Sequence, residues 1–125
     1  KEFTVWVDDN VNMVASPSHA TEIGAIVHRM IDREVEGTFH LMANESIGRM
    51  ELALLAAEIF ELDPELITTG PVPPEGVFPA AVPRDTSLDS TQTRHILDLG
   101  SYSVTDYLHM FKREMETGML EPLTA

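Results

Sequence analysis

Residues 38–60, TFHLMANESIGRMELALLAAEIF, decide the fold class, because they join a candidate strand to an apolar helix. Thr38–Met42 is a short strand candidate, and Asn44–Ser46 is a polar turn that includes a plausible helix cap. The run that follows, Ile47–Phe60, is apolar around much of its circumference, as expected for a helix that packs on more than one side. This stretch therefore predicts a domain that mixes strands and helices.

A second helix is expected on the N-terminal side of this stretch. Ser16 or Ser18 could cap it, and Pro17 is tolerated in a first helical turn because its missing N–H is not needed there. We expect this helix to end at Gly37 and to leave Glu22 outside its apolar stripe. The stripe at helical spacing consists of Ile23, Ile26, Val27, Met30 and Ile31.

Further elements are expected at both ends of the chain. Phe3–Val7 is rich in β-branched and aromatic residues and Leu66–Thr69 is another short strand candidate, whereas Gly70–Pro83 contains five prolines and is expected to be a long loop. Thr91–Asp98 is a short helix candidate, and Ser103–Asp106 matches a capping box. The last apolar stripe consists of Val104, Tyr107, Leu108, Phe111 and Met115. The sequence thus predicts an α/β or α+β fold with three or four helices and a small, short-stranded sheet.

Composition limits the possible partners. The chain has 125 residues, enough for one domain, and its formal net charge of −13 comes from 21 acidic and 8 basic residues spread along the sequence. Nucleic acid is therefore not expected as a partner, because phosphate binding needs a basic face. No apolar run is long enough to cross a membrane, and the lack of cysteine fits a cytoplasmic protein.

The sequence does not predict a metal site. Asp8–Met13 begins like a calcium-binding loop, but Met13 stands where the turn glycine is needed and His19 where the bidentate glutamate is needed. The histidines lack the spacing of metal ligands, and no cysteine is present. The chain also has no G-x-S-x-G nucleophile elbow and no glycine loop that could hold a phosphate.

Three segments, in order, resemble one family. They are ASPSHATEIGAIVHRMI (residues 15–31), the stretch 38–60, and PRDTSLDS (residues 83–90). The family is that of the extended short-chain dehydrogenase/reductases, in particular the dTDP-4-dehydrorhamnose reductase-like proteins. The resemblance implies that residues 1–125 form a single substrate-binding domain, excised from the C-terminal part of a Rossmann-type NAD(P)-binding enzyme.

The resemblance also implies a reaction that this chain serves but does not perform. In the family, a hydride passes from the nicotinamide to the keto carbon of a nucleotide-linked deoxysugar, and a Tyr-x-x-x-Lys pair assists it. Tyr102 and Tyr107 both lack a lysine four residues later. We therefore expect no catalytic and no cofactor-binding residue here, and NAD(P)H is expected on an N-terminal Rossmann domain of the parent protein.

The resemblance places substrate-binding residues in two loops. Ser16, Pro17 and Ser18 lie in the first, and Arg84 and Asp85 lie at the end of the proline-rich loop. The implied ligand is a nucleotide sugar, and the guanidinium of Arg84 could bind its diphosphate through paired donors.

Each of these residues also has a purely structural interpretation. The two serines could be helix caps alone, and Arg84 could pair with one of the many carboxylates. Arg49, in the first turn of a helix, is expected to be solvated. Leu88 is expected to be a core anchor and Asp89 a cap for the helix after it.

Departures from the family pattern keep a second function open. Val82 stands where an arginine is expected, and Asn12 where an aspartate is common. A non-catalytic regulatory module on the same fold, like the beta subunit of methionine adenosyltransferase, is the alternative. A third possibility is an independent small α/β protein with a fortuitous resemblance. If the chain is an excised lobe, an exposed apolar face and formation of a homo-oligomer are expected.

Overall fold

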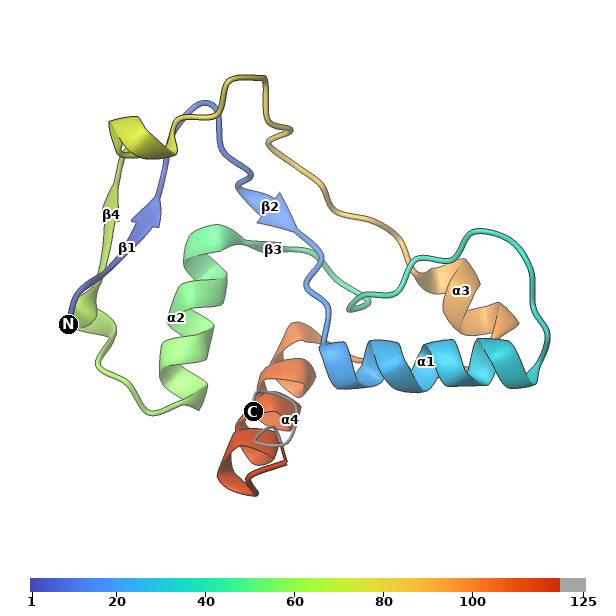
Figure 1. The fold of residues 1–125 in the computed structure, drawn as a ribbon. Helices are drawn as coiled ribbons and strands as arrows, with labels where there is room; N and C mark the ends of the chain where they lie inside the picture. Colours follow the sequence, from blue (N-terminus) through green and yellow to red (C-terminus); the bar gives the residue numbers. More distant parts are fainter. Residues whose placement is uncertain (120–125) are drawn as a thin grey trace. The chain divides into compact units, whose positions relative to one another are not determined.

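The computed structural model describes residues 1–119, and it has a mixed α/β fold. Within this range there are four α-helices and four short strands, which pair as two two-stranded sheets (Figure 1). The predicted fold class is thus confirmed at this coarse level. The chain forms two compact units: unit 1 comprises Lys1–Ala15 and Ile47–Ser87, and unit 2 comprises Ser16–Ser46 and the described residues from Leu88 onward.

The first sheet of unit 1 is parallel. Its strands β1 (Phe3–Trp6) and β4 (Ile67–Gly70) lie side by side, with Val5 opposite Thr69. Parallel strands need a long crossover, and here the connection includes the helix α2 (Arg49–Ile59), which packs against β1. Val5, on β1, is buried at 3% exposure. Both predicted strands are therefore confirmed, each to within one residue at its ends.

The second sheet of unit 1 joins three stretches of the chain. Strand β2 (Val14–Ala15) runs antiparallel to β3 (Ile47–Gly48), and Val14 also forms a parallel bridge to Asp85. Because β3 takes the first two residues of the predicted helix 47–60, α2 begins only at Arg49. This sheet places the start of α2 beside the end of the proline-rich loop.

The proline-rich loop, Gly70–Pro83, is irregular as predicted, apart from the single 3-10 turn η2 (Pro74–Gly76). Asn10 holds the far end of this loop, because its Oδ1 accepts a 2.7 Å hydrogen bond from the Val82 amide. Another 3-10 turn, η1 (Pro64–Leu66), precedes β4.

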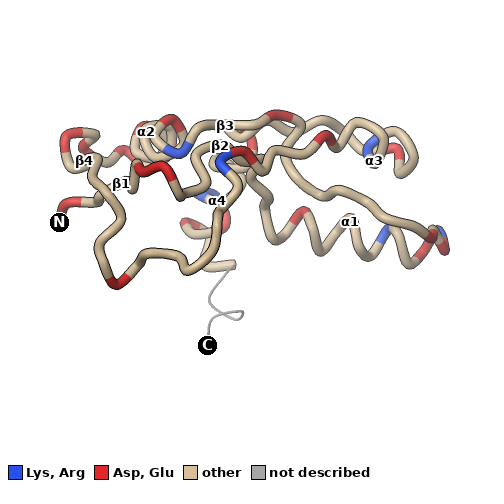
Figure 2. The backbone as a smooth tube through the Cα atoms, turned by 90° about the horizontal axis from the view of Figure 1, so that it is seen from above, with Lys and Arg blue, Asp and Glu red and all other residues tan. Residues whose placement is uncertain are grey.

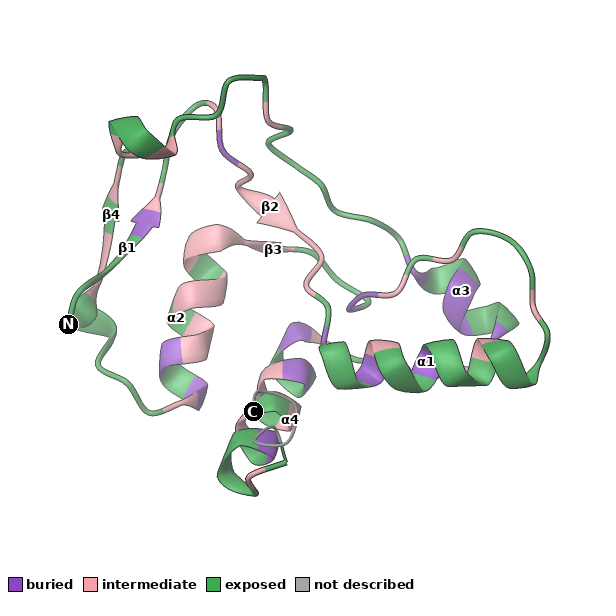
Figure 3. Ribbon diagram, viewed as in Figure 1, coloured by how far each residue is buried: buried purple, intermediate pink, exposed green. Residues whose placement is uncertain are grey.

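Unit 2 is built on helices α1 (Ala20–Asp32), α3 (Thr91–Ile96) and α4 (Val104–Glu116), each of which has a buried face (Figure 3). The predicted capping box at the start of α4 is confirmed: Ser103 Oγ accepts from the Asp106 amide, and Asp106 accepts from the Ser103 amide. The buried apolar residues of unit 2 are Ile26, Met42, Ala43, Leu97, Val104 and Tyr107.

The prediction that Ser16 or Ser18 caps α1 is wrong. The N-cap residue is His19, and it makes no side-chain cap bond. The serine hydroxyls are engaged elsewhere: Ser16 bonds the main chain of Leu88, and Ser18 donates to the Leu41 carbonyl. Leu88 is 49% exposed, so the expected core anchor acts through its main chain instead.

The end and the buried face of α1 also differ from the prediction. The helix ends at Asp32 rather than Gly37, since Glu34 already adopts left-handed backbone with φ of 51°. Ile31 is 70% exposed, whereas Glu22, expected outside the apolar stripe, is only 9% exposed. The face of α1 that packs therefore contains a carboxylate.

The predicted strand Thr38–Met42 is absent from the structure. This segment is irregular, because its main-chain groups bond single partners rather than a neighbouring strand. The His40 amide donates to Thr93 Oγ1 at 3.0 Å, and the Ala43 amide just beyond the segment donates to the Pro17 carbonyl at 2.8 Å.

Candidate functional site

Three stretches that are distant in sequence meet in unit 1, and each belongs to or adjoins one of the segments that carry the resemblance. Residues 12–15 pair with residues 47–49 through the β2–β3 sheet. Residues 12–15 also pair with residues 83–87, through the bridge between Val14 and Asp85. This meeting point is the candidate functional site, because it holds the loop that carries Arg84.

The side-chain amide of Asn12 lies at the centre of this site. Its Nδ2 is 3.0 Å from the Val14 carbonyl oxygen and 3.0 Å from Thr86 Oγ1. The same nitrogen is 3.3 Å from both the Pro83 and the Arg84 carbonyl oxygens. One donor group thus ties the first stretch to the third.

The backbone of Arg84 is held firmly while its side chain is exposed. The Arg84 carbonyl accepts from the Met13 amide at 2.8 Å and from the Val14 amide at 3.1 Å, and the Thr86 amide donates to the Val14 carbonyl at 3.0 Å. Among residues 1–119, no carboxylate forms an ion pair with the Arg84 guanidinium. Its charged donors are therefore available to a ligand.

Asp85 and Asp89 both form tight local turns. Asp85 Oδ1 accepts from the Ser87 amide, and Asp89 Oδ1 accepts from the Thr91 amide, each at 2.8 Å. These hydrogen bonds, from side chain and backbone of Ser87 and of Thr91, hold the pKa of each carboxyl below its ordinary value of 3.8. Both carboxylates are ionised at neutral pH. The prediction that Asp89 caps α3 is wrong in position: the N-cap residue is Ser90, and Asp89, one residue before it, accepts from the first helical amide, that of Thr91.

Arg49 was predicted to be solvated, but its side chain bonds the main chain of a distant residue. It is the first residue of α2 and is half-buried, and its Nε donates a 2.8 Å hydrogen bond to the Asn12 carbonyl. Its own amide donates to the Met13 carbonyl at 2.8 Å. Arg49 therefore braces the stretch that carries Asn12 against the start of α2.

The other predicted site residues, Ser16, Pro17 and Ser18, lie in unit 2, whereas Arg84 and Asp85 lie in unit 1. Ser16 Oγ donates to the Leu88 carbonyl at 3.2 Å and accepts from its amide at 3.1 Å, which leaves one acceptor lone pair. Ser18 Oγ donates at 3.0 Å and keeps its acceptor capacity. These three residues fasten the start of unit 2, and the hydroxyls retain limited capacity for a ligand.

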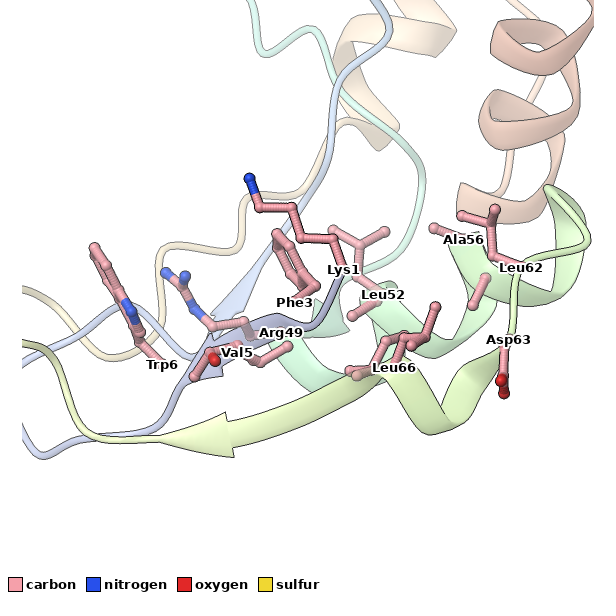
Figure 4. A pocket seen from close by; sticks show the side chains of 14 residues that line it. Lys1, Phe3, Val5, Trp6, Arg49, Leu52, Ala56, Leu62, Asp63 and Leu66 are labelled. Carbon is pink, nitrogen blue, oxygen red and sulfur yellow. The ribbon is translucent and has the colours of Figure 1, made fainter.

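Unit 1 also contains an apolar groove of about 750 Å³ between β1, α2 and η1 (Figure 4). Phe3 and Leu62 are largely exposed within it, at 63% and 62%. The charged groups on its lining are Lys1, Arg49 and Asp63. The apolar lining residues are Phe3, Val5, Trp6, Leu52, Ala53, Ala56, Ala57, Leu62, Leu66 and Ile67.

Unit 2 has a more polar hollow of about 590 Å³ beside α3. It is lined by His40, Asp89, Thr91, Gln92 and His95. Within residues 1–119, no group of three or more histidine or carboxylate side chains is placed to hold a metal ion.

A buried ionic cluster in unit 2 was missed by the sequence reasoning. Arg94, 6% exposed, donates to Glu22, to the Tyr107 hydroxyl at 3.0 Å, and to the main-chain carbonyls of Met42 and Gly100. This arginine thereby connects α1, α3 and α4 with two irregular segments. Its sequence signal is its place on α3, three residues before the buried Leu97, where an apolar side chain would be expected.

A second buried pair lies in the same unit. His19 Nε2 and Glu114 Oε1 are 2.9 Å apart, and both residues are less than a tenth exposed. The His19 ring lies 5.8 Å from that of Tyr107, which also bonds Arg94. Within the described residues, Glu22 Oε2 and Glu114 Oε2 are buried and have no hydrogen-bond donor. The cluster is therefore only partly satisfied.

Acidic residues are distributed along the backbone of both units, and basic residues are fewer (Figure 2). Lack of a carboxylate partner does not set Arg84 apart, because Arg29, Arg33 and Arg49 bond main-chain carbonyl oxygens instead.

The sequence matches no protein-family model, and no curated protein is significantly similar to it. None of the helices in the described part of the chain is both long and apolar enough to cross a membrane.

Proposed function

We propose that this chain is the substrate-binding region of an NAD(P)-dependent sugar-nucleotide reductase resembling dTDP-4-dehydrorhamnose reductase. The observation that carries the proposal is the meeting of three stretches around Asn12, each from or beside a segment that resembles this family. The proposed setting is the cytoplasm, in deoxysugar or polysaccharide synthesis. The proposed partners are the nucleotide sugar and the N-terminal Rossmann domain of the parent protein.

Arg84 is the proposed diphosphate ligand. A guanidinium presents parallel N–H donors that match the oxygens of a phosphate group, and here no carboxylate of the described residues competes for them. The ionised carboxylate of Asp85 would repel a diphosphate. It can instead accept a hydrogen bond from a sugar hydroxyl, and Ser16, Pro17 and Ser18 are the further proposed substrate contacts.

The residues of this chain bind and orient the substrate. The hydride is supplied by NAD(P)H bound to the parent's Rossmann domain. Contacts remote from the reacting carbon accelerate such a reaction because they fix the substrate in position before hydride transfer. Arg84, held through its backbone, is suited to this role.

Titration of the isolated chain with dTDP-glucose and, separately, with NADPH tests the proposal. We expect weak binding of dTDP-glucose and no binding of NADPH. The variant Arg84→Ala should weaken dTDP-glucose binding by about tenfold or more, since charge-assisted bidentate bonds contribute on the order of 1.5–3 kcal/mol. The matched control is Arg113→Ala, which removes the same charge from an exposed position on α4.

Three results would contradict the proposal: tight NADPH binding by this chain alone, no binding of dTDP-glucose, or equal effects of the two arginine variants. Isothermal titration calorimetry at fixed, low ionic strength gives all three measurements, because screening by salt would hide a charge contribution.

One observation favours the alternative, a regulatory module without catalysis. Val82, at the position where the family has an arginine, is half-buried and uses its amide to bond Asn10. Because valine carries no charge, no cation is available at this position for an anionic ligand. The sequence of the proposed N-terminal Rossmann domain distinguishes the two functions: a glycine-rich dinucleotide motif with Tyr-x-x-x-Lys favours the enzyme, and the loss of that tyrosine favours regulation.

A further inference from the structure

Asn12 is placed to control the conformation of Arg84. Four acceptors surround its Nδ2, two at 3.0 Å and two at 3.3 Å, and three of the four are main-chain carbonyl oxygens. A carboxamide nitrogen carries two hydrogens and can serve such a set, whereas a carboxylate has no donor. The side-chain chemistry of asparagine is thus required at this position, although aspartate has nearly the same shape.

Asn12 is itself fixed from the other side. The main-chain carbonyl of Asn12 accepts a 2.8 Å hydrogen bond from Nε of Arg49, the first residue of α2. Its neighbour Met13 accepts from the Arg49 amide and donates to the Arg84 carbonyl, both at 2.8 Å. A continuous chain of hydrogen bonds therefore runs from α2 through Asn12 and Met13 to Arg84.

This chain of bonds holds the Arg84 carbonyl toward three donors, the amides of Met13 and Val14 and the side chain of Asn12. These hydrogen bonds hold the Arg84 peptide, while the Arg84 side chain remains exposed. Ordering a loop in advance lowers the entropy lost on binding, which strengthens binding without a new contact.

We propose that Asn12 is a positioning residue, whose side-chain amide holds the Arg84 backbone so that the guanidinium is presented to the diphosphate of the ligand. This inference rests on the proposed function. Asn12 does not touch the ligand and acts only through Arg84.

The test is a double-mutant cycle between Asn12→Asp and Arg84→Ala, read out as affinity for dTDP. We expect Asn12→Asp to weaken binding by about fivefold or more when Arg84 is present, and to have no further effect in the Arg84→Ala background. A general structural defect would weaken both backgrounds equally. Asn12→Ala, which removes the donor without adding charge, replaces Asn12→Asp if the latter does not fold by circular dichroism.

Asn10→Asp is the matched control, because Asn10 lies two residues away and its Nδ2 donates to the Ala80 carbonyl at 3.0 Å rather than to Arg84. An aspartate at this position keeps the Oδ1 that accepts from the Val82 amide. Hydrogen exchange of the Met13, Val14 and Thr86 amides should accelerate in Asn12→Asp and stay unchanged in Asn10→Asp. Two results would overturn this inference alone: an affinity for dTDP that is the same in Asn12→Asp as in wild type, or additive effects of the two substitutions in the cycle. Failure of the wild-type chain to bind dTDP would overturn the proposed function together with it.

Discussion

Arg94 and Glu22 lie 72 positions apart in the sequence and form a buried ion pair inside unit 2, with Nη1 and Oε1 at 3.4 Å. The pair links α3 to α1, and Arg94 extends the link to α4 through the Tyr107 hydroxyl. Burial of ionised groups is costly unless their hydrogen bonds are complete, and Glu22 Oε2 has no donor among the described residues. The stability of unit 2 therefore depends on how this cluster is charged.

Stability should depend on pH through Glu22. Burial raises the pKa of Glu22 above its ordinary value of 4.5, and the attraction of Arg94 only partly opposes this. The folded protein thus binds this proton more tightly than the unfolded chain does, so the stabilising contribution is full below the unfolded-state pKa and is lost as pH rises through the folded-state pKa. The unfolding free energy of wild type minus that of Glu22→Gln should fall as pH rises above 4.5.

Urea melts between about pH 4 and pH 7 give this difference, in which the other carboxylates largely cancel. Glu36→Gln, at an exposed position, is the matched control for the loss of one carboxylate. A difference for Glu22→Gln that rises with pH would contradict the prediction.

Substitution of Arg94 should be severe. Arg94→Met leaves Glu22 buried without its partner and should lower the unfolding free energy by about 3–5 kcal/mol. Arg94→Lys keeps the charge but not the planar set of donors, so its effect should be intermediate. Arg113→Met, on the exposed surface of α4, serves as the control.

The double variant Glu22→Leu with Arg94→Met provides the sharper measurement. Because it removes both charges, it should be more stable than Arg94→Met alone, although it carries one more substitution. Denaturant unfolding measures all of these variants, and a double variant no more stable than the single one would show that Glu22 is not strained by the loss of Arg94.

Local patterns in the sequence were sufficient to predict some elements. The capping box of Ser103 and Asp106 depends on residues three apart, and the strand Phe3–Trp6 is marked by its own β-branched and aromatic side chains. The long loop Gly70–Pro83 is likewise specified by its prolines. Each of these predictions succeeded because the interactions that decide the structure are local.

The buried faces of α1 and α4 could not be predicted in the same way. Glu22 and Glu114 are buried while Ile31 and Met115 are 70% and 53% exposed. The carboxylates are buried because their partners Arg94 and His19 come from distant parts of the chain. An apolar stripe is a local signal. It does not indicate that Glu22 pairs with a residue 72 positions away, or that Glu114 pairs with one 95 positions away.

The candidate site was predicted in its segments but not in its contacts. The sequence indicated that Arg84 and Asp85 end a long loop, but not that Asn12 holds that loop or that Arg49 braces Asn12. These contacts depend on the register of β2 against β3 and on the bridge from Val14 to Asp85. Non-local pairing of such short strands leaves little trace in sequence.

Leu97 should be the residue of unit 2 most sensitive to loss of volume, because it is fully buried at 0% exposure. Leu97→Ala should lower the unfolding free energy by about 2–5 kcal/mol, the range for large-to-small substitutions in a packed core. The adjacent Ile96 is 48% exposed, and Ile96→Ala should cost less than about 1 kcal/mol. Similar decreases in unfolding free energy for the two variants, in thermal or denaturant melts, would show that Leu97 is not more deeply packed than Ile96.

The capping box of α4 should contribute stability in two separable ways. Ser103→Ala removes the acceptor for the Asp106 amide and should cost about 1 kcal/mol, whereas Thr105→Ala, exposed within the first turn, should cost less. Bonds from the Ser103 backbone and side chain lower the pKa of Asp106 below 3.8, so its contribution is present above that pH and is lost as pH falls further. The unfolding free energy of wild type minus that of Asp106→Asn, measured in urea melts, should therefore shrink as pH falls below 3.8. This pH dependence is opposite in sign to that of Glu22. A difference that grew on acidification would contradict the role of this carboxylate as a cap.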